Sequence, residues 1–202
     1  MEKQNRIIKG ALDLFMQKGV KGVNMDDVSN HLGISKKTLY QFVRNKEDLV
    51  EKSFVFHHNR IKTMIDGIRA KNENPIDEFF DITEGVCNLM KKRNPSFILD
   101  LKKYYPTVWE ITIHFRRDNI VKTISNNIMN GIEKGLYRND LKIEIITKLM
   151  LSKIESIVSE EVFPLTEYNF RELLDENRVY HIRGIATLKG LKYLENKLKK
   201  LK

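Results

Sequence analysis

The stretch NMDDVSNHLGISKKTLYQFV, residues 24–43, decides the fold of this 202-residue chain. A small residue, Ser29, is followed four positions later by Gly33 and ten positions later by Leu39. In a helix-turn-helix the small residue lets two helices approach closely, and the glycine adopts the conformation of the turn between them. The spacing therefore predicts two short helices joined at Gly33, the second of the kind that enters the major groove of DNA.

Polar residues mark where these helices begin. Asn24 is followed three residues later by Asp27, which is the pattern of a capping box with Asp in the place of Glu or Gln. Ser35 precedes the second helix, and Asn45 precedes a further one with Asp48 three residues on. The sequence predicts that a helix begins directly after each of these three caps, the second of them running to about Val43.

Apolar residues recur at helical spacing along the whole chain, and no alternating strand pattern is found. The first helix has one apolar stripe, formed by Ile8, Ala11, Leu12 and Phe15. Further helices are expected over about 46–70, 76–92, 96–105, 107–134, 141–158 and 176–202. The prediction is an all-α protein of about nine helices, with a three-helix head over 1–50, which contains the 24–43 motif, and a larger helical bundle over 51–202.

Composition narrows the function. The net charge of +9 favours nucleic acid or another anionic partner, although many basic proteins bind neither. Cys87 is the only cysteine, which excludes an intrachain disulfide and fits a reducing cytoplasm. No signal peptide and no run of about 18 apolar residues is found, so a cytoplasmic protein without a membrane segment is expected.

The sequence contains none of the common catalytic, metal-binding or nucleotide-binding motifs. The five histidines form no H-x-x-x-H or H-E-x-x-H pattern, and no nucleophile elbow, phosphate-binding P-loop or dinucleotide fingerprint occurs. Adjacent His57 and His58 point in different directions on a helix, so they are poor joint metal ligands. The sequence therefore predicts no enzyme activity, no metal and no cofactor.

The order F-x-x-x-G, then G-I-S-K-K-T-L-Y, then N-K-E-x-L over residues 15–49 resembles the DNA-binding head of the TetR/AcrR family of transcriptional regulators. Val43 departs from this pattern, because the family usually has an aromatic residue there. Beyond residue 50 the resemblance is confined to the turn over 131–141 and to length and helical content. The resemblance implies a DNA-binding head on a helical body.

The segment from Lys36 to Lys46 has four basic residues and no acidic one, which suits phosphate. The resemblance implies that Tyr40 and Lys46 contact phosphates, and Gln41 and Thr38 are placed to reach base edges. The residues predicted to bind DNA are Arg6, expected just ahead of the first helix, with Asn24, Ser35, Lys36, Lys37, Thr38, Tyr40, Gln41 and Lys46. The alternative is a merely solvated helix face, with Tyr40 packed on the first helix.

The resemblance also implies a body that dimerises through its last two long helices, expected over 141–158 and 176–196, and that holds a small-molecule pocket. Ligand binding would then change the separation of two heads and release the DNA. Pocket candidates are Met90, Phe97, Leu101, Tyr104, Trp109, Ile113 and Met150, an aromatic and methionine-rich set that suits an apolar or amphipathic effector. The alternative for each is ordinary packed core.

The function favoured by the sequence is a ligand-responsive transcriptional regulator, a repressor that binds a palindromic operator in double-stranded DNA as a homodimer. One alternative is a TetR-like scaffold that binds a ligand or a protein and has lost specific DNA binding. The other is an enzyme acting in the helical body, for which no motif is found.

Overall fold

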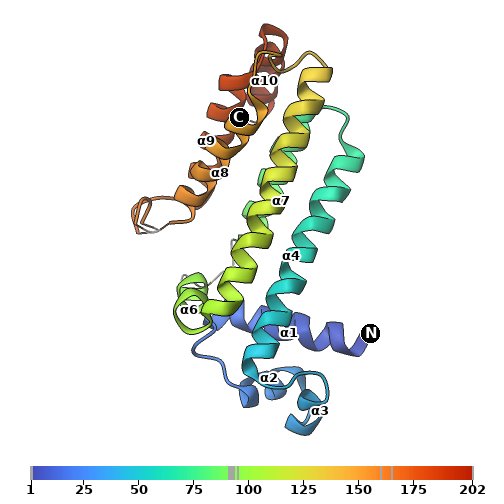
Figure 1. The fold of residues 1–202 in the computed structure, drawn as a ribbon, viewed down its shortest axis with the longest axis vertical. Helices are drawn as coiled ribbons and strands as arrows, with labels where there is room; N and C mark the ends of the chain where they lie inside the picture. Colours follow the sequence, from blue (N-terminus) through green and yellow to red (C-terminus); the bar gives the residue numbers. More distant parts are fainter. Residues whose placement is uncertain (1, 91–93, 95, 160, 165, 202) are drawn as a thin grey trace. The chain divides into compact units, whose positions relative to one another are not determined.

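The computed structural model describes residues 2–90, 94, 96–159, 161–164 and 166–201, and this part of the chain is helical (Figure 1). Its ten helices are α1 (Glu2–Lys18), α2 (Met25–Leu32), α3 (Lys36–Tyr40), α4 (Lys46–Lys71), α5 (Pro75–Met90), α6 (Ser96–Tyr104), α7 (Pro106–Glu133), α8 (Ile143–Ile157), α9 (Phe170–Ile185) and α10 (Leu188–Leu201). The prediction of an all-α chain with an N-terminal helix-turn-helix is confirmed. The expected end of a helix at residue 92 lies outside the described residues.

The chain divides into two compact units, and neither is continuous in sequence. The first unit consists of Met1–Lys62 and Leu89–Arg116, and the second of Thr63–Asn88 and Arg117–Lys202. The predicted boundary near residue 50 falls inside the first unit, within α4.

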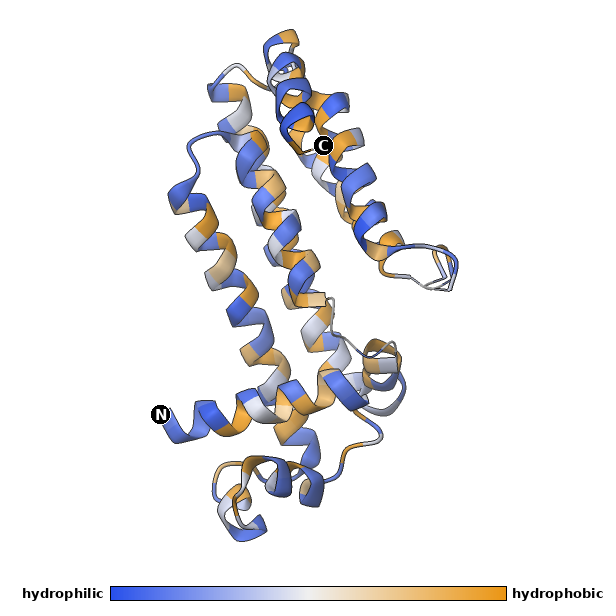
Figure 2. Cartoon of the chain, turned by 180° about the vertical axis from the view of Figure 1, so that it is seen from behind, coloured by the Kyte–Doolittle hydropathy of each residue, from blue (hydrophilic) through white to orange (hydrophobic). Residues whose placement is uncertain are grey.

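The core of the first unit combines the head helices with α6 and the start of α7. In Figure 2 hydrophobic and hydrophilic residues are interleaved along α1, as expected for a helix with one buried stripe. The buried apolar residues of this unit include Ile8, Leu12, Phe15, Val28, Leu39, Leu49, Phe54, Phe97, Leu101 and Val108. The rings of Phe54 and Phe97 stack with their centroids 4.9 Å apart. The core of the head is therefore completed by residues between 97 and 108, which belong to the second sequence segment of the same unit.

The second unit has its own core and a buried polar link. Its buried apolar residues include Ile76, Phe80, Ile128, Met150, Ile182 and Leu194. The buried Tyr137 hydroxyl donates to Asn127 Oδ1 at 3.2 Å, and Asn127 Nδ2 donates to the carbonyl of Pro75 at 2.8 Å. Each polar group is thus satisfied where water is excluded. Cys87 is also buried in this unit, in a smaller cluster with Ile157 and Leu174.

The prediction of one helix from residue 176 to the end is wrong, because α9 begins earlier, at Phe170, and ends at Ile185. Backbone N–H groups of Arg138 and Thr187 donate to the carbonyls of Ile185 and Leu136, each at 2.9 Å. The Thr187 hydroxyl then accepts from the Gly190 N–H at 3.2 Å, next to the first residues of α10. These hydrogen bonds to the turn around residues 136–138 replace those that would continue the helix beyond Ile185. The break between α9 and α10 therefore cannot be predicted from local helix propensity.

Helix α3 is also shorter than predicted, since it ends at Tyr40 and not near Val43. The N–H groups of Gln41 and Phe42 donate to the carbonyls of Thr38 and Leu39, three residues earlier, at 3.2 and 3.0 Å. Such bonds tighten the end of a helix into a turn. No described helix combines the length and the apolar character that crossing a membrane requires.

Candidate DNA interface

The turn between α2 and α3 is built as the sequence predicts. Gly33 has φ +64° and ψ 35°, the left-handed conformation that glycine adopts without steric cost. Its N–H donates to the carbonyl of Asn30 at 3.2 Å, and the N–H of Ile34 donates to that of Ser29 at 3.0 Å. Ser29 is buried, and its hydroxyl donates to the carbonyl of Met25 at 2.8 Å. The two helices are therefore fixed by local hydrogen bonds around one small residue and one glycine.

Side-chain caps fix where α2 and α3 begin. Asn24 Oδ1 accepts from the N–H groups of Asp26 and Asp27 at 2.8 and 2.9 Å, and Asp27 Oδ2 accepts from the N–H of Asn24 at 2.8 Å. This is the predicted capping box. Ser35 Oγ accepts from the N–H of Thr38 at 3.0 Å, and the hydroxyls of Ser35 and Thr38 lie 2.8 Å apart. Asn24, Ser35 and Thr38, all predicted DNA contacts, thus also hold the backbone.

The outer face of α3 presents long polar side chains. Leu39 is fully buried under the helix, whereas Lys37 and Gln41 are exposed and Tyr40 is 47% exposed. About half of Tyr40 is therefore open to solvent. Side chains with two donors or a donor and an acceptor, set on a helix of this kind, suit phosphates and base edges.

Two of the predicted lysines are held in place by neighbours. Lys36 Nζ forms an exposed ion pair with Asp26 at 2.8 Å. Lys46 Nζ donates to the carbonyl of Lys21 at 3.3 Å and lies 5.8 Å from the centre of the Tyr105 ring. Partial burial lowers the pKa of Lys46, since desolvation disfavours an ammonium ion. A phosphate would restore the electrostatic stabilisation that this burial removes.

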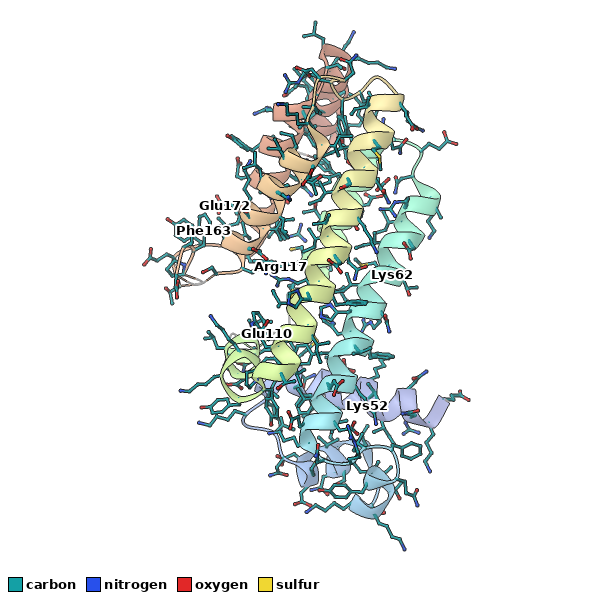
Figure 3. All side chains as sticks on the ribbon, in the orientation of Figure 1. Lys52, Lys62, Glu110, Arg117, Phe163 and Glu172 are labelled. Atoms are coloured by element: carbon teal, nitrogen blue, oxygen red, sulfur yellow. The ribbon has the colours of Figure 1, made fainter. Side chains whose placement is uncertain are left out.

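The connection from α3 to α4 is tied down by a third lysine. Lys52, labelled on α4 in Figure 3, donates to the carbonyl of Phe42 at 2.9 Å and to Asp48 Oδ2 at 2.8 Å. Asp48 also accepts from the N–H of Arg44 at 2.9 Å, and its own N–H donates to Asn45 Oδ1 at 2.9 Å. The orientation of α3 relative to the start of α4 is thereby set by partly buried hydrogen bonds.

Arg6 lies elsewhere than expected. Helix α1 begins at Glu2, so Arg6 is an exposed residue of its second turn and does not precede the helix. The acidic and polar residues ahead of Ile7 continue the helix because each of them is tolerated at its N-terminus.

Sequence reasoning missed a group on α6 that lies against the head. Lys21 Nζ lies 5.1 Å, and Lys103 Nζ 5.6 Å, from the centre of the Tyr104 ring. A hydrogen bond between Lys21 and the Tyr104 phenol raises the pKa of Lys21 and lowers the pKa of Tyr104. The Lys-Lys-Tyr end of α6 signals charge, but nothing in the sequence says that α6 packs beside residue 21.

Six of the seven pocket candidates belong to the first unit, and Met150 belongs to the second. Phe97 and Leu101 are buried in the core of the first unit, and Trp109 packs against it. Tyr104 is 40% exposed, and Met150 belongs to the core of the second unit. The two remaining candidates also belong to the first unit: Met90 is half-buried and Ile113 is buried. Phe97 and Leu101 serve the head because α6 packs on α1.

Within the described part of the chain, no three His, Cys, Asp or Glu side chains form a group that could hold a metal ion. The chemistry of the head is instead that of hydrogen-bond donors and cations presented on short helices.

Known proteins share both the head and the fold. Residues 7–52 match the family described as bacterial regulatory proteins, tetR family. The chain is 40% identical over 50 residues to the biofilm operon icaADBC HTH-type negative transcriptional regulator IcaR of Staphylococcus epidermidis, which covers 25% of this chain and 27% of that protein. With IcaR of Staphylococcus aureus (strain Newman) it shares 21% identity over 171 residues, covering 85% and 77%.

Two solved structures extend the similarity in fold to nearly the whole chain. A TetR-family transcriptional regulator from Cytophaga hutchinsonii aligns with a TM-score of 0.70 at 16% identity, covering 92% of this chain and 96% of that one. The regulator FadR from Bacillus subtilis, solved in complex with stearoyl-CoA, aligns with a TM-score of 0.68 at 16% identity, covering 89% and 98%.

Proposed function

We propose that this chain, a transcriptional regulator of the TetR family, is a homodimeric repressor that binds a palindromic operator and is released from it by a small molecule. The observation that carries the proposal is the exposed outer face of α3, where Lys37, Tyr40 and Gln41 surround a helix fixed by the Gly33 turn and the Ser35 cap. A helix presented in this way fits the major groove of DNA.

In the proposed complex the head residues divide into two groups. Tyr40 and Lys46 contact phosphates, while Thr38 and Gln41 reach base edges, with Gln41 suited to bidentate pairing with adenine. The remaining predicted contacts, which position the head along the backbone, are Arg6, Asn24, Ser35, Lys36 and Lys37. Asn24 and Ser35 also cap α2 and α3, so part of their contribution to DNA binding is indirect, because they hold these two helices in place.

Dimerisation is supported by exposed apolar residues on α8 and α9. Ile145 and Leu149, one helical turn apart on α8, are 52% and 55% exposed, and Tyr180 on α9 is 68% exposed. Apolar residues gathered on the surface of a single chain are typical of a contact with a partner. A two-fold dimer would present two heads to the two halves of a palindrome.

Replacing Leu149 with arginine is expected to break this dimer, because a charge left unpaired in an apolar interface costs about 3–5 kcal/mol. Light scattering after size-exclusion chromatography should then give the mass of one chain, and operator affinity should fall by more than about 100-fold. The matched control is Val55→Arg, which places the same charge on an exposed position of α4. A Leu149→Arg protein that remains dimeric would remove α8 from the interface.

The effector proposed is an apolar or amphipathic small molecule. The stearoyl-CoA in the FadR structure is a ligand of this class, and IcaR is a negative transcriptional regulator. Both support the proposed mode of action, in which the ligand favours a body conformation that cannot place both heads on the operator. We place this regulator in the cytoplasm.

The first test is selection of duplexes from a random library by the purified protein, followed by a salt titration on the selected sequence. A palindromic consensus with a clear margin over random DNA is the expected result. Weak binding that ignores sequence and disappears with modest salt would contradict the proposal and favour a scaffold without specific DNA binding.

A further inference from the structure

We infer that α6 extends the DNA-binding surface of the head, with Lys103 and Tyr104 joining Lys21 to bind a backbone phosphate outside the helix-turn-helix. This inference rests on the proposed function, since it assigns further contacts to the same partner. The three side chains belong to the first compact unit, and they come from α6 and from the loop between α1 and α2.

Hydrogen bonds attach the segment around α6 to the end of α1 and the loop that follows it. The N–H of Asn94 donates to the carbonyl of Met16 at 2.6 Å, and its side-chain Nδ2 donates to the carbonyl of Gln17 at 3.3 Å. The N–H of Lys21 donates to Asp100 Oδ2 at 2.9 Å. The position of α6 beside the loop is therefore fixed by the residue Asn94 ahead of the helix and by Asp100 within it, as a binding surface requires.

Two ammonium groups converge on one exposed ring. Lys21 Nζ and Lys103 Nζ lie 5.1 and 5.6 Å from the centre of the Tyr104 ring, and Tyr104 is 40% exposed. The ring quadrupole attracts both cations, so two positive charges lie near one exposed phenol. An anion bound beside the phenol would be attracted by both charges and accept a hydrogen bond from the hydroxyl.

The group is continuous with a proposed phosphate contact. Lys46 Nζ donates to the carbonyl of Lys21 at 3.3 Å, so the side chain of Lys46 reaches the same loop from which Lys21 extends. DNA presents a phosphate about every 3.4 Å of helix axis on each strand. A strand bound at Lys46 therefore brings its neighbouring phosphates to the surface formed by Lys21, Tyr104 and Lys103.

Two acidic side chains, Asp100 and Asp27, act on the lysines of this surface. Asp100 is on α6 and interacts with Lys21 through the backbone bond described above and through its charge. Its effect on Lys46 is also attractive. Asp27 attracts Lys46 as well. The three ammonium groups of Lys21, Lys46 and Lys103 outnumber these two carboxylates, so the surface keeps a positive balance that suits a phosphate diester.

The test compares Lys103→Ala and Tyr104→Phe with the unchanged protein on the selected operator and on an unrelated duplex. Lys103→Ala is expected to lower affinity about 5- to 10-fold on both duplexes, and to reduce the salt slope by about 0.9 for each bound protomer, while base preference stays the same. Tyr104→Phe should lower affinity about 3- to 10-fold with an unchanged slope, because a neutral donor releases no counterion.

The matched control is Lys199→Ala, which removes the same charge from α10 in the second unit and is expected to leave the slope unchanged. Neutralising single operator phosphates as methylphosphonates provides an independent measurement. One such phosphate should weaken binding of the unchanged protein and have no further effect on Lys103→Ala. Thermal melting of each variant checks that the head is still folded.

Wild-type affinity and slope in Lys103→Ala, together with a loss of binding in a Tyr40→Ala, Lys46→Ala double variant, would overturn the role of α6 and leave the proposed function standing. Failure of the unchanged protein to select any duplex would overturn both. The two proposals are therefore separated by the same set of titrations.

Discussion

Replacing both Tyr40 and Lys46 with alanine is expected to weaken binding to every duplex sequence by about 100-fold or more. A hydrogen bond to a charged group contributes about 1.5–3 kcal/mol, so the loss of one phenol and one ammonium contact removes about 3 kcal/mol or more. In a homodimer each contact is made twice, so 100-fold is the minimum loss expected. The effect is independent of sequence because phosphates carry no base information.

The measurement is fluorescence anisotropy on the selected operator and on random DNA, over a range of salt concentrations. The salt slope should fall by about 0.9 for each protomer, through Lys46 alone. Tyr40 is exposed, so its removal should leave the melting temperature nearly unchanged, whereas Lys46 has modest contacts to lose. Gln41→Ala is the contrasting variant, since it should alter base preference more than overall affinity.

Equal binding by the double variant and the unchanged protein would show that α3 does not dock as proposed. A loss confined to the operator, with random DNA bound as before, would also contradict it, because it would make Tyr40 or Lys46 a reader of bases.

Phe54→Ala is expected to destabilise the first compact unit by about 3–5 kcal/mol. Phe54 is 2% exposed, and its ring stacks on Phe97 of α6 at 4.9 Å. Removing it leaves a cavity in a packed core and also ends an aromatic contact between helices that are far apart in sequence. This cost is a large part of the stability of a typical domain.

Urea unfolding followed by circular dichroism measures this loss directly. Val55→Ala is the matched control, because Val55 is the next residue of α4 and is 45% exposed, so its truncation should cost less than about 1 kcal/mol. If Phe54→Ala unfolded at the urea concentration of the unchanged protein, the contact between α4 and α6 would contribute nothing to the core.

The parts of the fold that follow from the sequence are those determined by near neighbours. The caps at Asn24 and Ser35 and the turn at Gly33 depend on hydrogen bonds between residues no more than five apart, and each occurs as predicted. The break before α10 depends on the carbonyls of Leu136 and Ile185 meeting distant N–H groups, which no local pattern reveals.

The same distinction applies to the candidate sites. The exposed face of α3 follows from helical periodicity once Leu39 is known to point inward. The role of α6 does not follow from periodicity. Its apolar residues Phe97 and Leu101 are of the types that line ligand pockets, but they lie in the core of the head. Composition tells which residues avoid water, but not which neighbours they find.

The discontinuity of the first unit has a consequence for the kinetics of folding. Contacts among α1, α2 and α3 join residues close in the chain, and these can form early. The core they begin is closed only when Phe97, Leu101 and Val108 arrive, and this step requires closing a loop over the intervening residues 63–88. The docking of α6 is therefore expected to be the last step in the folding of the head. Local unfolding of the native head is expected to begin with the detachment of the same helix.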